Sequence, residues 1–98
     1  MLSTAYILSV IHGQRSDLHR HGVRRLALFG SAARGEATEN SDLDFLVEFD
    51  HKSFDAYMEV KELLERLFQR RVDLVIAEAV KPQLRDRILK EAVYAEGL

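Results

Sequence analysis

Alternation of apolar and polar residues predicts two β-strands, each with one buried face. In the segment 42–49 the buried face would carry Leu43, Phe45, Val47 and Phe49. The opposite face would carry Asp42, Asp44, Leu46 and Glu48. The segment 71–77 alternates in the same way, with Val72, Leu74 and Ile76 on a core face and Asp73 and Val75 opposite. A mostly apolar run over 24–29, which stops at Gly30, predicts a third strand.

Helical spacing of apolar residues predicts two long helices in the first two thirds of the chain. The first covers 2–21, with Ser3 or Thr4 as its cap and Gly22 as its stop. The second covers 53–68 and begins at Ser53. Its inward residues would be Phe54, Tyr57, Val60, Leu64 and Leu67.

Two further helical segments are predicted from turn and cap residues. Residues 31–34 would form a single helical turn that Ser31 caps and Gly35 ends. Pro82 suits the first turn of a last helix that reaches about residue 96. That helix would turn Leu84, Ile88, Leu89 and Val93 inward.

This order of elements is typical of one α/β domain spanning residues 1–98. We expect a small mixed β-sheet with helices packed on one face. The length of 98 residues and the 47% of hydrophobic residues are those of a single small globular domain with one core.

Composition then excludes several classes of function. The chain has no cysteine, which excludes disulfides, thiolate zinc sites and cysteine nucleophiles and favours a cytoplasmic location. The net charge of −2 creates no strong field toward phosphate backbones or anionic lipid. We therefore expect no direct nucleic-acid binding, and neither a signal peptide nor a membrane span.

Three aspartates are predicted to converge on the open face of the sheet. Asp42 and Asp44 lie on the same side of their strand, about 7 Å apart, and Asp73 joins them if the two strands are neighbours. Two such charges 4 Å apart repel each other by about 4 kcal/mol. A divalent cation bound by both carboxylates would make the same arrangement favourable. The alternative is that Asp42 caps a strand end while Asp44 and Asp73 solvate an exposed face.

The turn at Gly30 and Ser31 is a candidate anion site. Glycine permits close approach to the backbone, and a serine hydroxyl and free amides at a helix start are phosphate donors. Taken alone, a Gly-Ser turn is better explained as a tight connection between a strand and a helix. Its place directly before the aspartate pair favours an anion site next to a cation site, the two parts that a magnesium triphosphate needs.

The combined pattern resembles the signature of the DNA polymerase β-like nucleotidyltransferases. It consists of Gly30-Ser31, ten residues, Asp42-Leu43-Asp44 and a third aspartate on a later strand. The wider runs 28–35 and 41–47 are similar to those of the minimal nucleotidyltransferases, the MntA-type antitoxins encoded beside HEPN-domain toxins. The resemblance covers 23–77 closely, the last helix more loosely and the first helix by position. It implies a polymerase β-like palm in a single minimal nucleotidyltransferase domain.

The resemblance also implies a role for each site residue. Gly30 and Ser31 match the turn that holds the β- and γ-phosphates of ATP, and Arg34 is a candidate phosphate contact. Asp42 and Asp44 match the pair that bridges two Mg²⁺ ions, and Asp73 matches the third carboxylate, which helps bind the metal that activates the attacking hydroxyl. Larger members of the superfamily have a second domain that this chain does not match, so a partner chain should contribute to substrate selection.

The implied function is that of an antitoxin that transfers AMP from ATP to a tyrosine hydroxyl of a partner HEPN-type RNase toxin, and thereby silences it. Two other functions stay open at this point. The chain could neutralise the toxin by binding alone, or it could be a transferase acting on RNA ends or on a small antibiotic.

Overall fold

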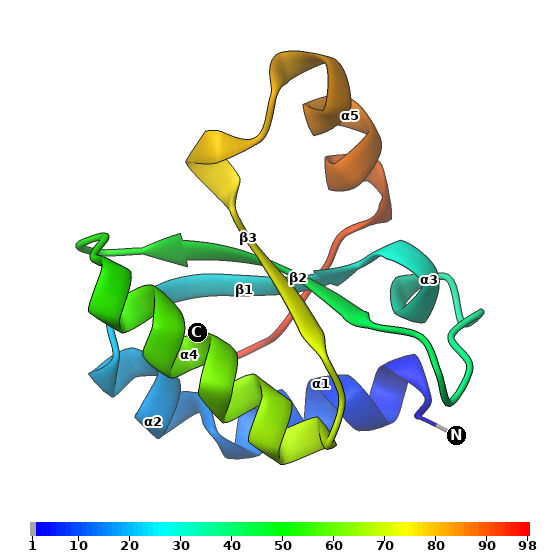
Figure 1. Ribbon diagram of the computed structural model, residues 1–98, viewed down its shortest axis with the longest axis horizontal. Helices are drawn as coiled ribbons and strands as arrows, with labels where there is room; N and C mark the ends of the chain where they lie inside the picture. Colours follow the sequence, from blue (N-terminus) through cyan, green and yellow to red (C-terminus); the bar gives the residue numbers. More distant parts are fainter. Residues whose placement is uncertain (1) are drawn as a thin grey trace.

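The three predicted strands and a fourth, short one form a single mixed sheet (Figure 1). The computed structural model describes residues 2–98. Its strands are β1 (Val23–Phe29), β2 (Leu43–Phe49), β3 (Val72–Ile76) and β4 (Val93–Tyr94), in the spatial order β3-β2-β1-β4. β2 pairs antiparallel with β1 and parallel with β3, while β4 pairs antiparallel with β1. The predicted α/β fold with a small mixed sheet is confirmed.

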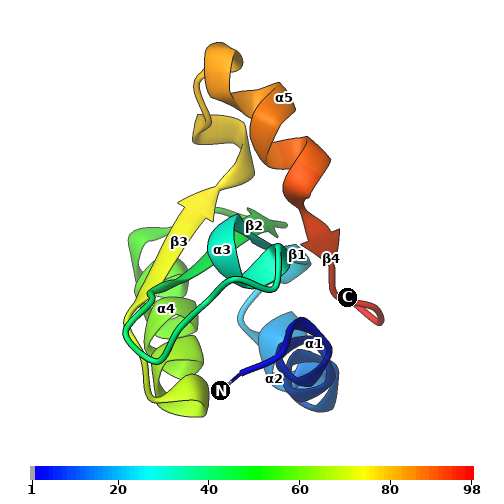
Figure 2. The ribbon, with the colours of Figure 1, turned by 90° about the vertical axis from the view of Figure 1, so that its right-hand side faces the viewer.

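Three helices cover one face of this sheet. These are α1 (Thr4–Gly13), α2 (Arg15–Arg20) and α4 (Phe54–Phe68), which all lie on the same side of the strands (Figures 1 and 2). α4 connects the parallel strands β2 and β3, as a crossover between parallel neighbours requires. Within residues 2–98, no helix combines the length and the apolar character needed to cross a membrane.

The predicted starts of the two long helices are confirmed, but the first helix is not continuous. The hydroxyl of Ser3 accepts a hydrogen bond from the Tyr6 amide, and that of Ser53 accepts one from the Ala56 amide. The prediction of one helix over 2–21 is wrong, because Gln14 adopts a non-helical φ of −106° and ψ of 13° between α1 and α2. The break follows a glycine, which weakens a helix interior.

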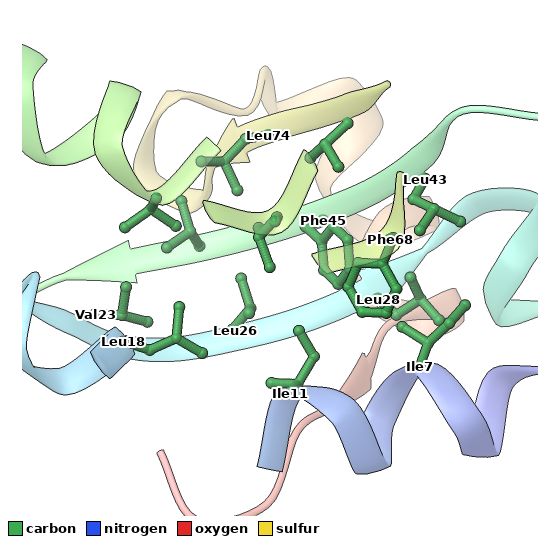
Figure 3. Close-up of a cluster of buried hydrophobic side chains, with 14 of the residues drawn as sticks. Ile7, Ile11, Leu18, Val23, Leu26, Leu28, Leu43, Phe45, Phe68 and Leu74 are labelled. Carbon is green, nitrogen blue, oxygen red and sulfur yellow. The ribbon is translucent and has the colours of Figure 1, made fainter. Parts of the chain in front are cut away.

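The covered face of the sheet and the three helices share one hydrophobic core (Figure 3). All four residues predicted for the buried face of β2 are at most 5% exposed. The helices contribute side chains with no exposed surface, among them Ile7, Ile11, Val60 and Leu64. The rings of Phe45 and Phe68 stack with their centroids 6.0 Å apart, which joins the centre of β2 to the end of α4.

Burial was predicted wrongly at four positions. Phe54, the first residue of α4, is 76% exposed because it lies in the loop and helix start over 50–55, where every residue is exposed. Leu84 and Leu89 were predicted to point inward and are each 46% exposed. Leu46, predicted on the open face of β2, is 3% exposed because the chain after β3 and α5 lie on that side of the sheet and surround it, Ile88 among them.

The last helix stands apart from the core and ends earlier than predicted. α5 (Pro82–Glu91) follows the short 3-10 helix η1 (Ala77–Ala79) and lies on the opposite side of the sheet from the other long helices (Figure 2). None of its residues is buried. The chain then forms β4, where Val93 pairs with Leu28 instead of continuing the helix, since the free edge of β1 supplies hydrogen-bond partners.

We predict that replacing a leucine by alanine lowers the free energy of unfolding more in α4, which packs on the core, than in α5, which does not. Leu64→Ala, in α4, should lower the free energy of unfolding by about 3 kcal/mol because it leaves a cavity in the core. Leu89→Ala, in α5, should lower it by less than about 1 kcal/mol. Urea denaturation followed by circular dichroism measures both values, and equal losses would contradict the peripheral position of α5.

Candidate active site

One row of paired residues across the sheet brings the predicted site residues together. Phe29 of β1 pairs with Asp44 of β2, and Asp44 pairs with Asp73 of β3. Because β1 ends where β2 and β3 begin, Gly30 follows directly at the end of this row. Asp42 is exposed one residue before β2, on the same side of the chain as Asp44.

Asp44 lies at the centre of this group, and the charges of its neighbours act on the ionisation of its carboxyl. Partial burial raises the pKa of the Asp44 carboxyl, and the charges of Asp73 and Asp42 raise it further. Arg34 acts in the opposite sense and lowers this pKa, and Glu91 raises it. The aspartates are therefore close enough to repel one another, which is a cost for the folded chain in the absence of a cation.

The oxygen donors of this group suit a magnesium ion that shares its ligands with a substrate. Within the described residues, no three His, Asp or Glu side chains are placed to hold a metal ion by themselves. Mg²⁺ in nucleotide enzymes takes one or two carboxylates, and waters and phosphates complete its coordination. Asp44 together with Asp42 or Asp73 could supply that number, and a divalent cation would remove the repulsion between them.

The turn after β1 requires glycine. Gly30 has a φ of +71°, and a Cβ atom on it would overlap Oδ2 of Asp44. The short helix α3 (Gly30–Ala33) begins at Gly30, with Phe29 as its N-cap and no side chain capping it. The predicted capping by Ser31 is therefore wrong, because the helix begins before Ser31 and places it inside the first turn. Ser31 instead lines a cavity next to Asp44.

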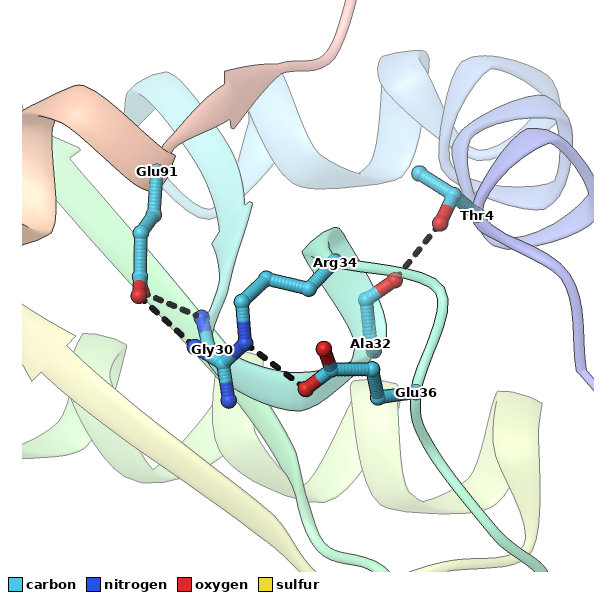
Figure 4. A network of polar contacts seen from close by, with 6 residues as sticks. All are labelled: Thr4, Gly30, Ala32, Arg34, Glu36 and Glu91. Carbon is cyan, nitrogen blue, oxygen red and sulfur yellow. Dashed lines mark hydrogen bonds and ion pairs between the residues drawn. The ribbon is translucent and has the colours of Figure 1, made fainter.

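Sequence reasoning missed Glu91, which reaches this turn from the end of α5 (Figure 4). Its Oε2 accepts a hydrogen bond from the Gly30 amide at 3.2 Å, and its Oε1 accepts one from Nη1 of Arg34 at 2.7 Å. Nε of Arg34 donates to Oε1 of Glu36 at 2.9 Å. These two carboxylates raise the pKa of the Arg34 guanidinium, which therefore stays protonated.

α5 forms one wall of the cavity at this site. The cavity has a volume of about 400 Å³, and its other wall is made by Gly30, Ser31, Arg34 and Asp44. The α5 side chains that line it follow helical spacing: Leu84, Arg87, Ile88 and Glu91. The helical spacing of these charged and apolar residues was visible in the sequence. The apolar residues among them were, however, predicted to face the core.

Comparison with known proteins gives one family match and closely similar structures. Residues 11–95 match the family model described as a nucleotidyltransferase domain. The protein adenylyltransferase MntA of Thermococcus cleftensis is 41% identical over 96 residues, which cover 96% of this chain and 97% of that protein. A candidate minimal nucleotidyltransferase of solved structure is 40% identical with a TM-score of 0.73, over 88% of this chain and 93% of that chain.

The fold also recurs in a solved complex of a tri-AMPylated HEPN toxin with an MNT antitoxin from Shewanella oneidensis. The matched chain there is 18% identical with a TM-score of 0.64, over 93% of this chain and 73% of that chain. At that identity the match concerns the fold.

We predict that neutralising Asp44 stabilises the chain when no metal is present. Asp44 has a raised pKa in the folded state, so its ionisation opposes folding, and this cost appears as the pH rises above the ordinary value of 3.8. Asp44→Asn should therefore raise the melting temperature by about 2–4 °C at neutral pH, and the gain should disappear in acid. Differential scanning calorimetry with chelator over a pH series measures it. A lower melting temperature at neutral pH would contradict the repulsion.

We also predict that a side chain at position 30 destabilises the chain. Gly30→Ala should cost about 1–2 kcal/mol of stability, because the left-handed backbone disfavours a Cβ and the Asp44 carboxylate must move. Gly35→Ala is a matched control, since Gly35 has a similar φ of +73° but open space around its Cβ position. Chemical denaturation of both variants should show the larger loss at Gly30.

Proposed function

Because the chain belongs to the family of nucleotidyltransferase domains, we propose that it is an antitoxin that transfers AMP from ATP to a tyrosine hydroxyl of a partner HEPN-type toxin. The observation that supports this proposal is the row Phe29–Asp44–Asp73, which has two carboxylates beside the Gly30 turn, with Asp42 one residue before β2. That edge offers donors for phosphate oxygens and acceptors for a divalent cation side by side, which is what a magnesium triphosphate requires.

Each predicted residue has a distinct task in this reaction. The Gly30 amide and the Ser31 hydroxyl would donate to the β- and γ-phosphates, and Arg34 would add a permanent positive charge next to them. Asp42 and Asp44 would hold Mg²⁺, with Asp73 beside them toward the acceptor. When bound, Mg²⁺ neutralises phosphate charge and eases loss of the proton from the attacking hydroxyl.

The transfer itself is a displacement at phosphorus. The tyrosine oxygen bonds to the α-phosphorus and loses its proton, while the bond from the α-phosphorus to the bridging oxygen breaks and pyrophosphate leaves. The chain forms no covalent intermediate in this scheme. Its residues contribute by position and charge, as is usual for phosphoryl and nucleotidyl transfer.

The nature of the acceptor is supported by the comparisons. The relative from Thermococcus cleftensis is named a protein adenylyltransferase, and the Shewanella oneidensis toxin carries AMP groups in complex with an antitoxin of this fold. Both favour AMP as the group transferred and a protein as the acceptor. A cytoplasmic location and the absence of direct nucleic-acid binding stay predictions.

Intact-mass spectrometry of the partner toxin tests the proposal. The HEPN-type toxin that the proposal requires as partner is incubated with ATP, Mg²⁺ and either the parent chain or the double variant Asp42→Asn, Asp44→Asn. The parent should add the mass of one or more AMP groups and stop the RNase activity. The double variant should lower the transfer rate by at least about 100-fold, because two charges are lost at nearly constant volume.

A control variant removes two exposed carboxylates away from the row. Asp50→Asn with Asp86→Asn changes the net charge equally and should transfer AMP at the parental rate. Protection of cells by the Asp42→Asn, Asp44→Asn variant at matched expression, with no mass added to the toxin, would contradict catalysis. That result would indicate an antitoxin that neutralises by contact.

A further inference from the structure

The amide that the proposed function assigns to ATP is already bonded to a carboxylate of the same chain. Glu91 accepts from the Gly30 amide with one oxygen and from the Arg34 guanidinium with the other (Figure 4). The Glu91 side chain is 22% exposed, so both bonds are partly sheltered from water. A carboxylate with two oxygens on these donors offers them a negative charge and acceptor oxygens, as a phosphate group would.

Glu91 and a triphosphate cannot use these donors together. The Gly30 amide has one hydrogen to donate, and it points to Oε2 of Glu91. A phosphate brought to the same place would also meet the negative charges of Glu91 and Asp44, which already act on each other across the cavity. Binding of the triphosphate at this turn therefore requires the Glu91 carboxylate to leave it.

Because α5 lies outside the core, moving the Glu91 carboxylate away from the turn should cost little free energy. The helix has no buried residue, no side chain caps its start, and two of its leucines are half exposed. Glu91 is the last residue of α5, and only Ala92 separates it from β4. The contacts of Glu91 with Gly30 and Arg34 thus join α5 to residues that are 61 and 57 positions away in the sequence, respectively.

We propose that Glu91 is an internal competitor for the nucleotide: its carboxylate occupies the phosphate position at Gly30 and Arg34 and lowers the affinity of the free chain for ATP. This inference rests on the proposed function, because it takes this turn as the phosphate site. Release of Glu91 frees the Gly30 amide and Arg34 at the same time. A partner that draws α5 away from the turn would therefore raise the affinity for ATP.

The test is the affinity of the whole chain for Mg²⁺-ATP in the absence of a partner, measured by isothermal titration calorimetry. Glu91→Gln keeps the shape of the side chain but removes its charge, and Glu91→Ala removes the group. Both should lower the Kd for ATP by about tenfold, since the binding-competent state becomes the main one. The matched control is Asp86→Asn, an exposed carboxylate on α5 outside the cavity, which should keep the parental Kd.

Three outcomes would overturn the inference, and a fourth would separate it from the proposed function. An unchanged Kd in both Glu91 variants would show that the carboxylate does not compete, and a higher Kd would make it a ligand or a support of the nucleotide. If no variant binds ATP, this turn is not a phosphate site, and the proposed function fails with the inference. If the Glu91 variants bind ATP more tightly but add no AMP to the toxin, the inference stands while the proposed function fails. Circular dichroism confirms that each variant is folded.

Discussion

The register between β1, β2 and β3 is the constraint on which the rest of the molecule depends. Antiparallel pairing ends β1 where β2 begins, and parallel pairing starts β3 at the same edge, so Phe29, Asp44 and Asp73 fall in one row. A slip of one residue would turn the aspartates toward the core and the apolar residues of β2 toward water. The buried face of β2 prevents that slip, because its four apolar side chains are buried in the core that the sheet shares with the helices. The same packing that stabilises the fold therefore also holds the carboxylates together against their mutual repulsion.

Local patterns were sufficient to predict the parts of the structure that depend on neighbouring residues. The strands over 42–49 and 71–77 follow from period-two alternation, and the caps at Ser3 and Ser53 follow from hydroxyls placed before apolar helical spacing. Gly30 was identified by the abrupt end of an apolar run, and its left-handed backbone explains why a glycine stands there. The grouping of Asp42 and Asp44 with Asp73 needed one assumption beyond local pattern, namely that β2 and β3 are neighbours.

Features that depend on distant parts of the chain were not predictable in this way. Leu46 is covered because the chain after β3 crosses to the other side of the sheet, and nothing near Leu46 in the sequence indicates it. The apolar residues of α5 show helical spacing, but spacing cannot tell a face that meets the core from one that borders a cavity. Glu91 reaches Gly30 across 61 residues, so its contact follows from the path of the backbone through α5 and β4. The break at Gln14 is local, yet a single glycine is too weak a signal to predict it.

Because α5 is peripheral, its residues can change the geometry of the site without changing the stability of the fold. In small domains these two properties usually change together. Substitutions in a core of this size change stability and geometry together, so few are neutral for both. α5 contributes a wall of the cavity and no buried residue, which leaves its sequence free to vary with little effect on the free energy of unfolding. Changes in nucleotide affinity or partner preference can therefore accumulate there without bringing the chain near its stability threshold. In evolutionary terms, α5 is a region of the domain that can diverge while the sheet and its carboxylates stay constant.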